Sequence, residues 1–124
     1  MNKLFIILWM IFFHVVADYN LQGWLASAKQ KSFWEQNAPE RKYRHDYICA
    51  LIMHSISWAF MIMIPIAYYY KFSVDWKFAL AFVVTVIMHA VIDHQKANEK
   101  TINLCEDQLL HMVQIAGVAT FLLL

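Results

Sequence analysis

The sequence predicts an all-α integral membrane protein, a bundle of about four transmembrane helices with one polar layer. Hydrophobic residues make up 61% of the 124-residue chain and charged residues 15%, against about half and about a quarter in ordinary soluble domains. Four apolar stretches are each long enough to cross ~30 Å of hydrocarbon at ~1.5 Å per residue. An apolar span must satisfy its own backbone hydrogen bonds, so each stretch is predicted to be a helix.

The four predicted spans make one domain of the whole chain, residues 1–124. They run over residues 4–22, 47–70, 78–95 and 104–124. Three consecutive tyrosines at positions 68–70, together with Trp76, flank the second loop and fit an aromatic belt at the membrane surface.

Residues 23–46, between the first two predicted spans, have a different composition. They mix Trp24, Phe33 and Trp34 with five Lys and Arg residues. This mixture predicts an amphipathic segment that lies on the membrane surface and is broken by Pro39 before the second span. An ordinary polar loop is the alternative.

Positive charge is divided unequally between the two sides of the predicted bundle. The first and third loops hold seven Lys and Arg residues, whereas the opposite side holds only Lys3, Lys71 and Lys77. The positive-inside rule therefore places the first and third loops in the cytoplasm and both termini outside. The formal net charge of +1 argues against a nucleic-acid surface, which would need a basic stripe.

Ionisable residues inside apolar spans are rare and costly, and here every predicted span carries at least one. The set is His14, Asp18, His54, His89, Asp93, Asp107 and His111. Three spans pair a His with an Asp four residues away, which places both side chains on one helix face within reach of a single ion. Because consecutive helices alternate in direction, all these positions fall within ~12 Å of the same membrane face. The sequence therefore predicts a metal centre in one layer.

His and carboxylate ligands suit zinc first, and then manganese or iron. Four His and three Asp exceed the ligands of one tetrahedral zinc ion, so either two ions bind or some of these residues hold the ligands in place. A polar network without metal, in which buried His and Asp pair across helices, is the alternative. His45, His94, Cys49 and Cys105 fall outside the pattern, and the two cysteines are expected to be reduced.

Other polar residues share the face of the predicted site. Candidates for contacts with the ligands or with a substrate are Gln22, Lys96, Gln108 and Gln114. Lys96 lies seven residues after His89, at the cytoplasmic mouth, where it could hold an anionic group. Gln114 lies three residues after His111, one layer deeper in the bundle.

The runs His14-Val-Val-Ala-Asp18-Tyr-Asn-Leu-Gln22, His89-Ala-Val-Ile-Asp93 and Asp107-Gln108-Leu-Leu-His111 resemble a family of small bacterial and phage membrane proteins known only as a domain of unknown function. The resemblance covers nearly the whole chain, and its HxxxDxxxQ opening is fairly specific. It implies a multi-span protein of the bacterial inner membrane in which these polar positions matter, but it implies no activity. The HxxxD helices also resemble, loosely, inner-membrane proteins described as metal-dependent hydrolases, whose other motifs are missing here.

These residues predict a membrane-embedded metal-dependent hydrolase at the cytoplasmic leaflet. Metal-bound water would attack an ester, amide or phosphoester, with Asp18 or Asp107 as general base and Lys96 anchoring an anionic group. Two other classes stay open: a non-catalytic membrane protein such as a phage effector or assembly subunit, and a proton or metal-ion conduit that would need an oligomer. Membrane lipid is the expected partner, and a homo-oligomer is left open.

Overall fold

The computed structural model describes all 124 residues and consists of helices joined by short loops. The helices are α1 (Lys3–Val15), α2 (Leu25–Ala28), α3 (Lys31–Asn37), α4 (Asp46–Tyr69), α5 (Trp76–His94) and α6 (Leu104–Leu123). Two π-helical turns, η1 (Val16–Asn20) and η3 (Gln95–Glu99), extend α1 and α5, and a 3₁₀ turn, η2 (Arg41–Tyr43), precedes α4. No residue lies in a strand, so the prediction of an all-α protein is confirmed.

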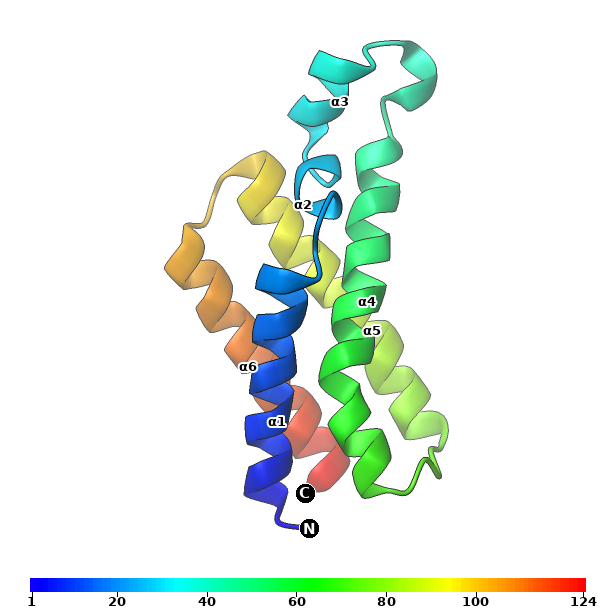
Figure 1. Ribbon diagram of the computed structural model, residues 1–124, viewed down its shortest axis with the longest axis vertical. Coiled ribbons are helices and arrows are strands. Elements are labelled where there is room, and N and C mark those ends of the chain that lie inside the picture. Colours follow the sequence, from blue (N-terminus) through cyan, green and yellow to red (C-terminus); the bar gives the residue numbers. More distant parts are fainter.

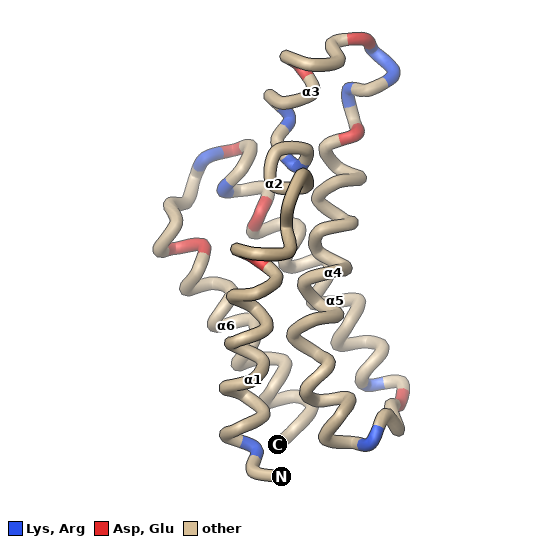
Figure 2. Tube along the Cα trace, in the orientation of Figure 1, with Lys and Arg blue, Asp and Glu red and all other residues tan.

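The four long helices, α1, α4, α5 and α6, form a bundle with both termini at one end (Figure 1). α4 packs against α1 and α5, and α6 packs against α5 and α1. The half of the bundle near the termini has an apolar core that includes Ile6, Met10, Ile62, Ile66 and Leu123. In Figure 2 this half carries charged residues only at its outer end, whereas several acidic residues lie in the opposite half.

Three segments are long and apolar enough to cross a membrane: Lys3–Asn20, Arg41–Tyr69 and Trp76–Glu99. They correspond to the first three predicted spans. α6 has 20 residues but is not among them, because its first half is rich in polar side chains that lower its mean hydropathy. Of these, Asp107, His111 and Gln114 are buried inside the bundle. These three polar groups of α6 therefore face the other helices.

Side-chain caps fix where the helices that carry the polar residues begin. Asp75 accepts a hydrogen bond from the backbone N–H of Lys77 and starts α5. α6 starts with a capping box, in which Asn103 and Glu106 each accept a hydrogen bond from the backbone N–H of the other. This box places Asp107 in the first turn of α6, with its side chain inside the bundle.

The segment between α1 and α4 folds back along α4 and does not form one continuous amphipathic helix. Its short helices α2 and α3 pack against the first turns of α4 (Figure 1). The turn into α2 contains Gly23, whose φ of 54° suits glycine. The rings of Trp24, Phe33 and Trp34 have centroids within 6.0 Å of one another, so they pack together. Contact of this segment with a membrane surface stays a prediction.

Candidate metal centre

Four segments of the bundle bring three imidazole rings and three carboxylates together. These side chains, referred to below as the His/Asp cluster, are Asp18 of η1, His54 of α4, His89 and Asp93 of α5, and Asp107 and His111 of α6. Three overlapping sets of three have their ligand atoms within 4.8 Å of one another: Asp18, His89 and His111; His54, His89 and Asp93; and Asp93, Asp107 and His111. All except the half-buried Asp18 are buried. The prediction that these residues converge agrees with this geometry.

His54 and His89 face the carboxylates on one side of the cluster. His54 Nε2 lies 3.4 Å from Asp18 Oδ1 and 3.3 Å from Asp93 Oδ2. His89 Nε2 lies 3.7 Å from Asp93 Oδ2 and 3.3 Å from His54 Nε2. His54, His89 and Asp93 thus form one compact group of ligand atoms, and Asp18 Oδ1 faces His54 beside it.

His111 faces the carboxylates on the other side. Its Nε2 lies 3.4 Å from Asp107 Oδ1, 3.5 Å from Asp93 Oδ1 and 3.8 Å from Asp18 Oδ2. Ligand atoms on a tetrahedral zinc ion with bonds of ~2.0–2.1 Å are about 3.3 Å apart. The distances from His54, His89 and His111 to the carboxylate oxygens are 3.3–3.8 Å. They are therefore close to the spacing of neighbouring ligand atoms on a zinc ion.

Several atoms that point into the cluster are buried without any hydrogen-bond partner. They include Asp18 Oδ1, Asp107 Oδ1 and His111 Nε2. Buried polar atoms in folded proteins are nearly always bonded, so unpaired ones gathered at one place require an explanation. Carboxylate oxygens have only lone pairs to offer, and an imidazole Nε2 can offer one. A bound cation would satisfy all three.

Two lysines hold carboxylate oxygens from the rim of the cluster. Lys29, which precedes α3, donates from Nζ to Asp93 Oδ2 at 2.7 Å. Lys96 of η3 donates from Nζ to Asp107 Oδ2 at 3.1 Å. The side chain of Lys29 is only 13% exposed, whereas that of Lys96 is 37% exposed and lies on the open side of the cluster.

His14 lies beside the cluster, with both ring nitrogens already bonded to protein. Its Nδ1 accepts the indole N–H of Trp58 at 2.9 Å, and its Nε2 pairs with Gln108 Oε1 at 2.9 Å. The Gln108 amide in turn donates to Oδ2 of Asp18 at 3.3 Å and of Asp107 at 2.9 Å. The sequence predicted His14 as a ligand; in the structure its ring nitrogens contact Trp58 and Gln108, and Gln108 in turn contacts two carboxylates of the cluster.

A π-helical turn lies at the C-terminal end of each of the two HxxxD pairs. η1 contains Asp18, and η3 begins two residues after Asp93. A π turn changes the direction of the side chains that follow it, and such turns are frequent at functional sites. In η3 the amide of Asn98 donates to Lys29 O at 3.0 Å and accepts from Lys31 N–H at 2.6 Å. This clamp holds Lys29 over Asp93.

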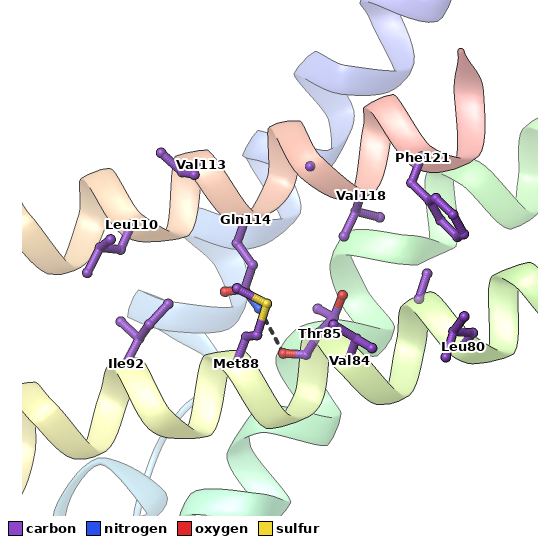
Figure 3. A pocket seen from close by; sticks show the side chains of 12 residues that line it. Leu80, Val84, Thr85, Met88, Ile92, Leu110, Val113, Gln114, Val118 and Phe121 are labelled. Atoms are coloured by element: carbon purple, nitrogen blue, oxygen red, sulfur yellow. Dashed lines mark hydrogen bonds between the residues drawn. The ribbon is translucent and has the colours of Figure 1, made fainter.

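The other two predicted glutamines contact backbone carbonyl groups. Gln22 donates to Asp18 O at 2.9 Å and closes the end of η1. Gln114 donates to Thr85 O at 2.8 Å and lines a groove of about 460 Å³ between α5 and α6 (Figure 3). The groove has a mostly apolar lining and contains no residue of the His/Asp cluster. Gln114 therefore supports helix packing one layer away from the ligands.

Two residues that the sequence did not single out touch the site. Trp58 lies four residues after His54, on the same helix face, and its ring stacks on His89 with centroids 4.1 Å apart. That spacing of four was available in the sequence. Lys29 is separated from Asp93 by 64 residues, and no local pattern relates the two.

The residues that the sequence excluded from the site do lie outside it. His45 is exposed and contacts Arg44, and His94 contacts Asn98. Cys49 and Cys105 are exposed and form no disulfide.

Residues 4–124 match the model of a family described as a protein of unknown function, DUF3307. The chain belongs to this family. The resemblance based on the HxxxDxxxQ opening is therefore confirmed, and in this DUF3307 chain the opening spans the end of α1, η1 and the turn that follows. No curated protein and no solved structure matches the chain.

Proposed function

We propose that this protein is an integral membrane protein that binds divalent metal in the His/Asp cluster and uses it to hydrolyse an ester, amide or phosphoester at the cytoplasmic leaflet. The observation that carries the proposal is the convergence of three imidazole nitrogens and three carboxylates from four segments of the bundle. Zinc suits this donor set first, and manganese or iron next.

Charge in the cluster favours a cation. Three carboxylates lie there, and only two lysine ammonium groups contact them. With neutral imidazoles, one negative charge is left without a partner in a buried site, which is costly. A divalent ion would more than compensate this negative charge and would supply partners for the unpaired ligand atoms.

A bound metal ion would supply the nucleophile. It would lower the pKa of a coordinated water toward neutrality and so make that water a better nucleophile. Whichever of Asp18 and Asp107 does not coordinate the ion would accept the proton through its unpaired Oδ1. The hydroxyl group of the water joins the acyl or phosphoryl centre, and the proton passes to the leaving group. Lys96, the more exposed lysine, would bind an anionic group of the substrate.

The surface of the bundle supports a place in the membrane. The long helices expose large apolar side chains along their length, for example Leu8, Phe12, Phe60, Val83 and Ile87. Three segments are long and apolar enough to span, and α6 packs among them as the fourth span because its polar groups face inward. The charge of the first and third loops then places the cluster near the cytoplasmic leaflet of the bacterial inner membrane. Lipid is the nearest source of substrate.

A second candidate is a non-catalytic protein whose cluster is a structural metal site or a polar network. Its support is that Lys29 and Lys96 already contact two of the carboxylates and that the cluster is buried. A conduit has less support, because the core between the cluster and the termini is apolar, with Met10, Ile62 and Val118 among its buried residues.

The hydrolase proposal is tested with detergent-purified protein and chromogenic carboxylic and phosphoric esters. Hydrolysis should stop on addition of a chelator and return with zinc. Asp107→Asn should lower kcat by about 10²–10⁴-fold, the usual contribution of a general base, whereas the exposed Glu35→Gln should not change it. Metal-loaded wild-type protein that hydrolyses none of these esters would favour the non-catalytic candidate.

A further inference from the structure

Asp18 and Asp93 each divide their two oxygens between the two sides of the cluster. Asp93 directs Oδ2 to His54 Nε2 at 3.3 Å and Oδ1 to His111 Nε2 at 3.5 Å. Asp18 directs Oδ1 to His54 Nε2 at 3.4 Å and Oδ2 to His111 Nε2 at 3.8 Å. Two carboxylates on different helices thus have the same arrangement.

This division sorts the ligand atoms into two sets of four. The first set is His54 Nε2, His89 Nε2, Asp18 Oδ1 and Asp93 Oδ2. The second set is His111 Nε2, Asp107 Oδ1, Asp18 Oδ2 and Asp93 Oδ1. In each set the three residues other than Asp18 have their ligand atoms within 4.8 Å of one another, and one oxygen of Asp18 faces a histidine of that set.

The unpaired atoms occur in both sets. Asp18 Oδ1 belongs to the first set, and Asp107 Oδ1 and His111 Nε2 belong to the second. A single ion bound by one set would leave buried unpaired atoms in the other, which is costly. Two ions would satisfy both sets.

We infer that the cluster is a dinuclear metal centre in which Asp18 and Asp93 bridge the two ions. His54 and His89 complete the first coordination shell, and Asp107 and His111 complete the second. Two-metal sites hold their ions about 3.5–4 Å apart, a distance that bridging carboxylates set. The inference rests on the proposed metal-binding function and adds the number of ions. It also makes Asp18 and Asp107 ligands in place of general bases.

A dinuclear centre also narrows the class of substrate. Two divalent ions together with Lys29 and Lys96 place six positive charges against three carboxylates, so the excess charge requires a bound anion. Such a site favours an anion whose oxygens can contact both ions, and phosphate esters are the common case. In hydrolysis the oxygen of water bonds to phosphorus, the bond from phosphorus to the leaving oxygen breaks, and that oxygen takes the proton.

The number of ions is tested by loading metal-free protein with Mn²⁺, measuring bound manganese by elemental analysis and recording its paramagnetic resonance spectrum. We expect two equivalents and the spectrum of a spin-coupled pair. Asp107→Asn, which alters only the second set, should reduce binding to one equivalent with an uncoupled six-line spectrum. Wild-type protein with one uncoupled equivalent would overturn the dinuclear centre and leave the single-metal hydrolase standing. Wild-type protein with no bound metal would overturn both.

The substrate class is tested with inorganic phosphate. Its ³¹P resonance should broaden when phosphate is added to the manganese-loaded protein. Lys96→Ala should weaken this binding by about tenfold, the loss of one charge-assisted hydrogen bond, while the exposed Lys100→Ala should leave it unchanged. A two-ion protein that does not broaden the phosphate resonance would refute phosphate esters as substrates.

Discussion

Trp58 of α4 donates its indole N–H to Nδ1 of His14 of α1 at 2.9 Å. An indole can only donate, so His14 must accept with Nδ1 and carry its proton on Nε2. That proton is then donated to Gln108 Oε1, which turns the Gln108 amide toward the carboxylates of Asp18 and Asp107. One indole thereby sets the direction of a chain of hydrogen bonds that ends at two carboxylates of the His/Asp cluster.

Trp58→Phe should weaken metal binding without removing a ligand. Loss of the indole N–H leaves His14 Nδ1 buried without a donor and frees its ring to turn, which disorients Gln108. Outer hydrogen-bond partners of metal ligands typically contribute 10–100-fold to affinity, so the Kd for zinc should rise by about that factor. Trp9→Phe removes the same atoms beside Phe13 and Tyr68 and is the matched control. Equal effects of the two substitutions on zinc affinity would contradict this role.

His89→Ala should lower both metal occupancy and stability. The imidazole is fully buried between Trp58 and His111, so its removal leaves a cavity and one ligand fewer. The free energy of unfolding should fall by about 2–5 kcal/mol, as for other large side chains truncated in a core. His94→Ala, five residues along α5 and outside the cluster, should keep its metal. Thermal unfolding in detergent and elemental analysis measure the two effects.

Lys29→Met should make the protein depend on metal for its stability. Without the ammonium group, Asp93 is buried next to fewer positive charges, and breaking a buried ion pair costs about 3–5 kcal/mol. Added zinc should restore most of the loss in Tm, since the ion then compensates the carboxylate. The exposed Lys31→Met is the control, and its Tm should respond to zinc as the wild type does. If zinc raised the Tm of Lys29→Met no more than that of the wild type, Lys29 would have no such role.

Much of the site could be predicted because helical spacing is a local property. The pairs His89–Asp93 and Asp107–His111 lie four residues apart, which is sufficient to place each pair on one face. That each face turns inward followed from the cost of exposing a carboxylate to lipid. The depth of the cluster followed from the alternation of helix directions. These parts of the prediction needed no knowledge of the tertiary structure.

The remaining parts depend on contacts between segments that are distant in the sequence. Lys29 reaches Asp93 only because Asn98 of η3 fastens the start of α3, and no local pattern encodes that contact. The orientation of His14 is set by its contact with Trp58 of α4, which no local sequence pattern shows. The HxxxD spacing alone therefore suggested that His14 is a ligand. By mean hydropathy α6 falls outside the segments that could span a membrane. The reason is visible only in the packed structure, where its residues Asp107, His111 and Gln114 are buried against the other helices.

The proposed orientation predicts that the first loop is cytoplasmic and the second loop lies outside. Cys49 and Cys105 are free and exposed, so both are first replaced by serine. In that background Lys71→Cys should react with a membrane-impermeant maleimide on intact cells, and Lys31→Cys should react only after permeabilisation. Both positions are exposed on the protein. Labelling of Lys31→Cys from outside would reverse the orientation and place the cluster at the outer leaflet.

The metal content of the purified wild-type protein tests the central claim most directly. Protein prepared in detergent without chelators should carry at least one equivalent of a divalent transition metal, zinc first, and two equivalents if the centre is dinuclear. Removal of the metal should lower Tm, because three buried carboxylates lose their main compensating charge. Wild-type protein that contains no metal, and whose Tm is unchanged by chelator or by added zinc, would contradict the metal centre and the hydrolase together.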